Sequence, residues 1–237
     1  MISVCMATYN GESYIEEQLS SILNQIGLND EIIVSDDNST DNTIAKIESF
    51  HDSRIQILIN DPLQKGYTKN FGNSLKRARG DVIFLSDQDD VWANNKVTIT
   101  LEVLRDADFC VSDAEVVDQD LHMLYPSHFD FAHVKKGFMQ NFVKTRYIGA
   151  CMAFRKDVLM KALPFPNNAK FCAHDYWIAI VAESFFRVRL IDEALIFYRR
   201  HDKNASTGGL VKSNESIAFR IMKRLYCGYH LIRHMLI

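Results

Sequence analysis

The chain has 237 residues, of which 47% are hydrophobic and 24% are charged, and its formal net charge is −3. This length favours one large α/β unit with a small appendage, and the composition is that of an ordinary soluble globule, which argues against disorder except at the ends. A general nucleic-acid binder normally carries a basic excess. We therefore expect no nucleic-acid partner.

The five cysteines are odd in number, and no two are spaced as C-x-x-C. We interpret them as reduced, mostly buried small hydrophobic residues, which is typical of a reducing compartment; a zinc site is the alternative, and its ligand spacing is missing. The start of the chain lacks the basic and apolar regions of a secretory signal. No uninterrupted run of about 18 apolar residues occurs, so we expect no helix that spans a membrane. We expect a cytoplasmic protein.

The first half of the chain alternates strand-like runs with stretches of helical periodicity. The continuous apolar run from Ile2 to Ala7 is typical of a strand covered on both faces. The elements that follow are a helix over 15–26, a strand over 31–35, a helix over 42–50, a strand over 54–59, a helix over 67–79, a strand over 81–86, a helix over 96–105 and a strand over 108–112. This order predicts a mostly parallel central sheet with helices on both faces.

The second half is less regular. Residues 113–147 are rich in His, Asp and aromatic side chains, and we expect them to form long loops over the site. The pattern then predicts a strand over 147–154, a helix over 176–186, and one or two strands within 187–198. Residues 202–215 are polar and contain two adjacent glycines, which favours a mobile loop.

Three polar clusters follow predicted strands: Thr8-Tyr9-Asn10 after the first, residues 36–39 after the second, and residues 87–90 after the fourth. In a parallel sheet the carboxyl ends of the strands share one edge, and ligands bind outside that edge. The sequence therefore predicts one functional site that combines all three clusters.

The last of these clusters contains Asp87, Asp89 and Asp90. Three carboxylates within four residues repel one another unless a cation lies between them. A hard divalent cation takes oxygen ligands, and a diphosphate can complete its coordination. The alternative is a solvated turn that caps the next helix.

Three further groups have a chemical and a structural interpretation each. Asp36 or Asp37 could accept hydrogen bonds from a pyrimidine base or a ribose, or belong to a capping turn. Asp175 could be a general base or cap the helix that it opens. The basic run at residues 199–201 suits a leaving diphosphate and a metal ion, or an ordinary solvated strand end.

Taken together, these segments resemble the family-2 glycosyltransferases with the GT-A fold, over roughly residues 2–206. The segments that carry the resemblance are SVCMATYNG at 3–11, EIIVSDDNSTD at 31–41, GDVIFLSDQDDVW at 80–92, GACMAF at 149–154, HDYW at 174–177, and YRRH at 198–201 with Asn204. The last two most resemble bacterial rhamnosyltransferase-like members that build surface polysaccharides.

The resemblance implies a Rossmann-like GT-A domain over 1–206, with a nucleotide-binding half at 1–112 and an acceptor-binding half at 113–206, followed by a loop and helical tail at 207–237. It implies metal-dependent, inverting transfer of a single sugar from a UDP- or dTDP-sugar to a saccharide or lipid-linked saccharide. The Q-x-x-R-W motif of processive members is absent, which favours transfer of one sugar. The pair before the predicted base helix is His-Asp, where the family usually has Glu-Asp or Asp-Asp.

The resemblance also assigns roles to residues. They are Thr8, Tyr9, Asn10, Glu12, Asp36 and Asp37 for the nucleotide; Asp87, Asp89, Asp90 and His201 for Mn²⁺ or Mg²⁺; Arg199 and Arg200 for the diphosphate; Asp175 as the catalytic base; and His174 and Trp177 for the acceptor.

Two other functions compete with a transferase. A sugar-nucleotide nucleotidyltransferase would usually carry a Gly-rich phosphate loop with a basic residue after the first strand, where this chain has Thr8-Tyr9-Asn10-Gly11-Glu12. A non-catalytic sugar-binding module would have no reason to keep Asp87, Asp89 and Asp175 together.

The end of the chain predicts a basic amphipathic helix. No acidic residue follows Glu215, and the basic residues there are Arg220, Lys223, Arg224 and Arg233. The apolar residues near one helical face are Ile217, Ile221, Leu225, Tyr229 and Ile232. Such a helix, within 216–237, can lie on the inner face of the cytoplasmic membrane. The alternative is a helix packed on the catalytic domain or on a second copy of the chain in a homodimer.

Overall fold

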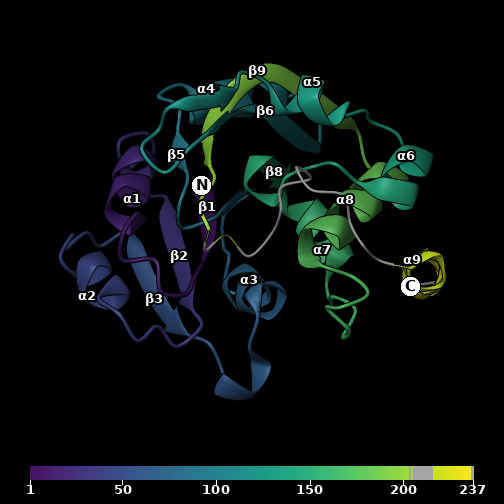
Figure 1. The fold of residues 1–237 in the computed structure, drawn as a ribbon, viewed down its shortest axis with the longest axis horizontal. Helices are drawn as coiled ribbons and strands as arrows, with labels where there is room; N and C mark the ends of the chain where they lie inside the picture. The colour runs from purple at the N-terminus through teal and green to yellow at the C-terminus, as the bar shows by residue number, and fades with distance from the viewer. Residues whose placement is uncertain (203, 205–215, 236–237) are drawn as a thin grey trace.

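The computed structural model describes residues 1–202, 204 and 216–235 (Figure 1). Nine strands form one sheet in the order β3-β2-β1-β4-β8-β6-β9-β5, and β7 pairs with β6. The strands are β1 (Ile2–Thr8), β2 (Glu31–Asp36), β3 (Ile55–Ile59), β4 (Val82–Ser86), β5 (Val91–Trp92), β6 (Phe109–Val117), β7 (Met123–Tyr125), β8 (Met152–Arg155) and β9 (Val188–Arg199).

Helices cover both faces of the strands that begin the chain. Figure 1 shows α1 and α2 beside β2 and β3 on one side and α3 on the other. The helices are α1 (Ile15–Leu23), α2 (Thr43–Glu48), α3 (Tyr67–Leu75), α4 (Lys96–Val103), α5 (His128–Ala132), α6 (Phe138–Lys144), α7 (Lys156–Ala162), α8 (His174–Phe185) and α9 (Ile217–Met235), with short 3₁₀ turns η1 (Pro62–Gln64) and η2 (Gly149–Cys151).

The first half of the sheet is parallel, as predicted. β3, β2, β1 and β4 pair in parallel, with Thr8 opposite Asp36 and Met6 opposite Ser86. The apolar run of β1 is buried because helices and neighbouring strands enclose it on every side. This register brings the carboxyl ends of β1, β2 and β4 to one edge, which is where the three polar clusters begin.

The second half makes the sheet mixed. β8 lies antiparallel between β4 and β6, and β5 pairs antiparallel with β9. The prediction of long loops over 113–147 was wrong, because β6 continues to Val117 and β7, α5 and α6 follow. The strand predicted over 147–154 begins at Met152, after the turn η2. The domain boundaries at residues 112 and 206 stay a prediction.

All five cysteines are buried and free, as predicted. No helix within the described ranges has the length and apolarity needed to cross a bilayer. The predicted mobile loop over 202–215 lies outside the described residues, apart from positions 202 and 204.

The helix α9 packs one face against the rest of the protein. Cys227 and Leu231 are buried there, the ring of Tyr226 lies 5.5 Å from that of Phe171, and Lys161 donates a hydrogen bond to a carbonyl near the end of the helix. The face that the sequence predicts to be apolar points the other way: Ile217, Ile221, Leu225, Tyr229 and Ile232 are all exposed.

Candidate active site

A cavity of about 900 Å³ lies at the edge where β1, β2 and β4 end. Its wall also includes the turn before α3, the segment from α5 to η2, and the start of α8. The predicted site residues that line it are Thr8, Tyr9, Asp37, Asp87, Asp89, His174 and Asp175. The fold therefore brings together side chains that are up to 167 residues apart in the sequence, from Thr8 to Asp175.

The two adjacent carboxylates at the end of β2 have different surroundings. Asp36 is buried behind the wall, where its carboxylate accepts hydrogen bonds from the Thr8 hydroxyl at 2.9 Å and from the Ser39 hydroxyl at 2.6 Å. Asp37 lines the cavity; one of its oxygens accepts from the Gly66 amide at 2.8 Å and the other from the Asn60 side chain at 2.9 Å. Asp36 therefore positions Thr8, and Asp37 is the carboxylate available to a ligand.

The predicted nucleotide residues Asn10 and Glu12 lie outside the cavity wall. The Asn10 side-chain oxygen accepts from the Thr40 amide at 2.8 Å, and the Glu12 carboxylate accepts from the Asn42 amide at 2.9 Å. Both side chains join the loop after β1 to the loop after β2. A direct contact with the nucleotide does not follow from this placement.

Gln88 is a site residue that the sequence analysis missed. Its side-chain oxygen accepts from the Tyr9 amide at 2.8 Å, and its side-chain nitrogen donates to the Tyr9 carbonyl at 3.1 Å. A Cβ atom on Gly11 would lie 2.4 Å from the same side-chain oxygen. These two hydrogen bonds connect the acidic loop to the end of β1. Because the two residues are 79 positions apart, no local sequence pattern predicts this contact.

The carboxylates of the acidic loop influence one another electrostatically. Asp87 and Asp89 line the cavity, whereas Asp90 is fully buried and accepts a hydrogen bond from the Arg199 amide at 3.0 Å. Burial, reinforced by Asp89 and Asp175, raises the pKa of Asp87 to about 7. Burial, followed by the charges of its acidic neighbours, also raises the pKa of Asp90. A cation would stabilise this arrangement.

His201 and Asn204 converge on Asp89. The Nε2 atom of His201 and the side-chain nitrogen of Asn204 each lie 2.9 Å from Asp89 Oδ2. The ring of Tyr14 stacks on His201 with centroids 4.8 Å apart. The structure thus brings together the predicted metal residues Asp89 and His201, and it adds Asn204, which lines the cavity.

Arg199 lies behind the acidic loop. It contacts the carboxylate of Glu17 and donates to the backbone carbonyls of Asp89 at 2.8 Å and Gln119 at 2.6 Å. The prediction that it contacts a diphosphate does not fit this placement, because its guanidinium is buried and already paired. The neighbouring Arg200 contacts the ring and hydroxyl of Tyr198 and does not line the cavity.

Asp175 lies at the start of α8, where the helix dipole favours a carboxylate. One of its oxygens accepts from the Tyr176 amide at 2.7 Å. A Cβ atom on Gly149 would lie 3.3 Å from the Asp175 Cβ, so the chain at η2 packs tightly against this residue. The predicted base is therefore positioned in the cavity by two separate segments.

Of the two predicted acceptor residues, one lines the cavity and the other is buried in the core. His174 lines the cavity with its ring stacked 4.2 Å from that of Phe71, burial lowers its pKa, and its nitrogens have no hydrogen-bond partner in the described part of the chain. Trp177 is fully buried and donates to the Ala162 carbonyl at 2.7 Å. It cannot contact an acceptor, because it lies on the inner face of α8.

A network anchored on Glu183 holds the segment over the cavity. One carboxylate oxygen accepts from the Tyr147 hydroxyl at 2.6 Å, the Gly137 amide at 2.9 Å and the Asn141 side chain at 3.0 Å. Burial raises the pKa of Tyr147, and the hydrogen bond to Glu183 and then the charge of that carboxylate raise it further. These residues fix α6 and the chain that follows it, within the stretch that the sequence predicts to be a loop.

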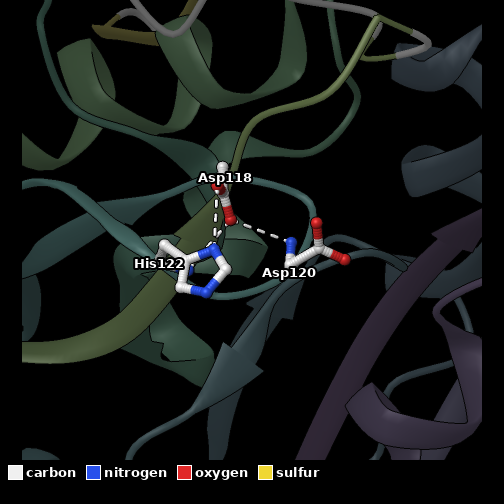
Figure 2. A group of neighbouring side chains, drawn as sticks. All are labelled: Asp118, Asp120 and His122. Carbon is white, nitrogen blue, oxygen red and sulfur yellow. Dashed lines mark hydrogen bonds and ion pairs between the residues drawn. The ribbon is translucent and has the colours of Figure 1, made fainter.

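Figure 2 shows a second acidic group, at the turn between β6 and β7. The ligand atoms of Asp118, Asp120 and His122 lie within 4.8 Å of one another. One oxygen of Asp118 accepts from the amides of Asp120 and His122, both at 2.9 Å. Because these bonds form the turn itself and the group lies outside the cavity, we assign it to the hairpin and not to the active site.

A mixed sheet with polar and acidic clusters at the carboxyl ends of its parallel strands is the arrangement expected of a GT-A glycosyltransferase. The model for Glycosyl transferase family 2 matches residues 3–163, and the chain belongs to this family. The predictions of the family, the fold and the enzyme class are thereby confirmed.

Curated bacterial proteins are similar to the chain over most of its length. The dTDP-rhamnosyl transferase RfbG of Shigella flexneri is 32% identical, over 84% of this chain and 72% of RfbG. The UDP-Glc:α-D-GlcNAc-diphosphoundecaprenol β-1,3-glucosyltransferase WfgD of Escherichia coli is 34% identical, over 78% of this chain and 71% of WfgD.

Solved structures share the fold at low sequence identity. TarS of Staphylococcus aureus in complex with UDP-GlcNAc superposes with a TM-score of 0.70 at 19% identity, covering 90% of this chain and 61% of the TarS chain. The mannosyltransferase PcManGT of Pyrobaculum calidifontis, in complex with GDP-Man and Mn²⁺, superposes with a TM-score of 0.63 at 19% identity, covering 98% of this chain and 62% of that chain. The chain thus spans about three-fifths of these two solved chains.

Proposed function

We propose that this protein is a metal-dependent, inverting glycosyltransferase. It moves a single sugar from a UDP- or dTDP-sugar to a saccharide or lipid-linked saccharide in surface polysaccharide biosynthesis. The observation that carries this proposal is the convergence of Asp37, Asp87, Asp89 and Asp175 on one cavity at the carboxyl ends of parallel strands. The names of two relatives contribute to it, since RfbG uses a dTDP-sugar and WfgD acts on a diphosphoundecaprenol-linked saccharide.

The nucleoside half of the cavity suits a pyrimidine. Each oxygen of the Asp37 carboxylate already accepts one hydrogen bond within the protein, and a remaining lone pair on the cavity side can accept an imide N–H, which both uracil and thymine carry. Thr8, the last residue of β1, and the exposed ring of Tyr9, directly after it, also line this part of the cavity. These groups bind and orient the nucleoside, so that the sugar extends toward Asp175.

A divalent cation fits the acidic loop. Asp87, Asp89 and His201 offer carboxylate oxygens and one imidazole nitrogen, a donor set that suits Mn²⁺ or Mg²⁺. The buried Oδ2 atom of Asp90 has no partner among the described residues. When bound, the cation supplies charge neutralisation to the nucleoside diphosphate. Proteins of similar fold have been solved in complex with Mn²⁺ and a nucleotide or nucleotide-sugar, which favours the same assignment.

Asp175 is the proposed general base. Its carboxylate accepts the proton of the acceptor hydroxyl as that oxygen forms a bond to the anomeric carbon. The bond from the anomeric carbon to the phosphate oxygen breaks on the opposite side, and the electron pair leaves with the nucleoside diphosphate. Attack from the face opposite the leaving group inverts the anomeric configuration.

The exposed side of α9 supports a location at the inner face of the cytoplasmic membrane. Its apolar stripe recurs every three or four residues from Ile217, which is 76% exposed, to Ile232, which is 60% exposed. Basic side chains flank the stripe, and no acidic residue occurs in the helix. A helix of this kind lies in the headgroup plane of an anionic bilayer. The competing occupant of the stripe is a second copy of the chain.

The test is a screen of donor turnover. UDP-, dTDP- and GDP-sugars are incubated with the protein in Mn²⁺ or in a chelator, and release of nucleoside diphosphate is measured with and without saccharide acceptors. The proposal predicts turnover of one pyrimidine donor that needs the metal. Turnover that instead requires pyrophosphate would identify a nucleotidyltransferase, and no turnover of any donor would favour a non-catalytic module.

A further inference from the structure

The cavity is lined by carboxylates at the strand ends and by cations on the segment that follows α5, with one further cation, Lys65, on the turn before α3. The strand-end wall presents Asp37, Asp87 and Asp89, whereas the segment between α5 and η2 presents Lys144 and Arg146. The stretch 131–147, which we call the lid, contains no aspartate or glutamate. The cavity is thus shaped for a ligand whose anionic part meets the lid.

Among the described residues, no carboxylate pairs with either of the two lid cations that line the cavity, Lys144 and Arg146. The Arg146 guanidinium donates to the His133 carbonyl at 2.7 Å, and the Arg146 carbonyl accepts from His128 at 3.0 Å. A guanidinium held by its backbone contacts, beside an ammonium group, is a pair of donors that suits phosphate.

The lid is joined to α9 directly before Lys144. Arg224 donates to the Val143 carbonyl from Nε at 2.9 Å and from Nη2 at 2.6 Å. A Cβ atom on Gly228 would lie 3.5 Å from the Phe142 ring. The side chain of Val143 is 63% exposed, and that of Met139, one helical turn earlier, is 68% exposed. The apolar surface of α9 therefore has a neighbouring apolar patch on α6, next to the cavity.

Past Lys144, the chain leads straight to the proposed base. Gly149, five residues further on, packs against Asp175. Along this short segment the structure therefore has an apolar surface at Val143, two cations at 144 and 146, and the base that would activate the acceptor. A lipid-linked acceptor has the same order of parts: an apolar chain, a phosphate linkage and a saccharide.

We propose that Lys144 and Arg146 bind the diphosphate that links the acceptor saccharide to its lipid. This inference rests on the transferase function proposed above and deepens it, because it names the part of the acceptor that the lid recognises. Each cation forms a charged hydrogen bond to the diphosphate, and such bonds are stronger than those between neutral groups. The lid thereby selects anionic acceptors over neutral glycosides.

The experiment measures binding of farnesyl diphosphate by titration calorimetry. UDP and Mn²⁺ are kept at saturating concentrations, so that the donor site is filled. The proteins compared are the wild type, Lys144→Gln, Arg146→Gln and the control Lys136→Gln, which removes an exposed lid cation that does not line the cavity. We expect each cavity variant to bind farnesyl diphosphate about tenfold more weakly, and the control to bind as the wild type does.

Three results would overturn the inference. The first is equal affinity for farnesyl diphosphate in all four proteins. The second is binding of inorganic pyrophosphate as tight as that of farnesyl diphosphate, which would indicate a site for free phosphates. The third is a matching loss of UDP affinity in Lys144→Gln and Arg146→Gln, which would place the cations on the donor. Donor turnover in Mn²⁺, measured on the same samples, reports separately on the transferase function.

Discussion

At the scale of single residues, a side chain that reacts differs in a measurable way from side chains that only bind. A general base acts in the transition state, so its loss lowers kcat and leaves ground-state binding nearly unchanged. We expect Asp175→Asn to reduce kcat by about 10²- to 10⁴-fold, with donor affinity within a few-fold of the wild type. Steady-state kinetics and donor titration measure the two quantities. A collapse of donor affinity would make Asp175 a ligand or a helix cap.

The raised pKa of Asp87 predicts a dependence of stability on pH. The pKa of Asp87 is about 7 in the folded protein and near 4 in the unfolded chain. Between about pH 4 and pH 7, the folded protein therefore holds a proton on Asp87 that the unfolded chain has released. The contribution of this group to the free energy of unfolding therefore falls as the pH rises from about 4 to 7. Asp87→Asn removes the titrating group.

In a chelator at pH 8, we expect Asp87→Asn to be more stable than the wild type by on the order of 2–4 kcal/mol, since each pKa unit corresponds to about 1.4 kcal/mol. Near pH 4 the two proteins should be equally stable. Urea unfolding at both pH values gives the comparison. A difference that is the same at pH 4 and pH 8 would show that the carboxyl does not titrate in this range.

At the scale of elements, the lid depends on one carboxylate. Glu183→Ala removes the acceptor for the Tyr147 hydroxyl, the Asn141 side chain and the Gly137 amide. Because these partners are partly buried, we expect a loss of about 2–4 kcal/mol in the free energy of unfolding. Hydrogen exchange should show lost protection over 137–147 before the sheet is affected. The control is Glu193→Ala, which removes one exposed hydrogen bond, to Asn95, and should change stability by less than about 1 kcal/mol.

A second prediction at this scale concerns membrane binding by the exposed apolar stripe of α9. Leu225→Glu places a charge on the stripe at a position that is 69% exposed, so the fold should survive. We expect this variant to lose co-sedimentation with anionic vesicles, and the wild type to lose it as salt rises, because surface charges are screened over about 8 Å at physiological ionic strength. Met160→Glu, at another exposed position, is the control.

If neither the wild type nor the variants sediment with the vesicles, α9 does not bind the membrane. A sedimentation-velocity shift from dimer to monomer in Leu225→Glu would then assign the stripe to a second copy of the chain.

At the scale of the whole molecule, the parallel half of the sheet could be predicted because its evidence is local. The apolar run of β1 and the polar residues directly after β1, β2 and β4 are visible in the sequence. The register of the parallel strands then brings these polar residues to one edge of the sheet. β6 was cut short in the prediction because Asp113 looked like a loop residue. Its carboxylate accepts from Ser127 and from the Phe129 amide, contacts that exist only once the hairpin has formed.

The same limit explains which site residues the sequence could not place. Arg199 looked like a phosphate ligand, but its partner Glu17 is 182 residues away. The resemblance assigns Trp177 to the acceptor, but the face of α8 on which it lies is set by the packing against α7. Gln88 and Asn204 act by holding backbone and carboxylate groups across the edge of the sheet. Tertiary contacts decide all four placements.

We propose that the acidic loop binds a donor through a divalent cation, and calorimetric titration of UDP and dTDP can decide this. The titrations use the wild type and Asp89→Asn, each in Mn²⁺ and in a chelator. We expect the wild type to bind one of these nucleotides tightly in Mn²⁺ and weakly in the chelator, and Asp89→Asn to keep its fold and bind that nucleotide equally weakly in both conditions. Binding to the wild type that is unchanged by the chelator, or metal-dependent binding that survives in Asp89→Asn, would contradict it.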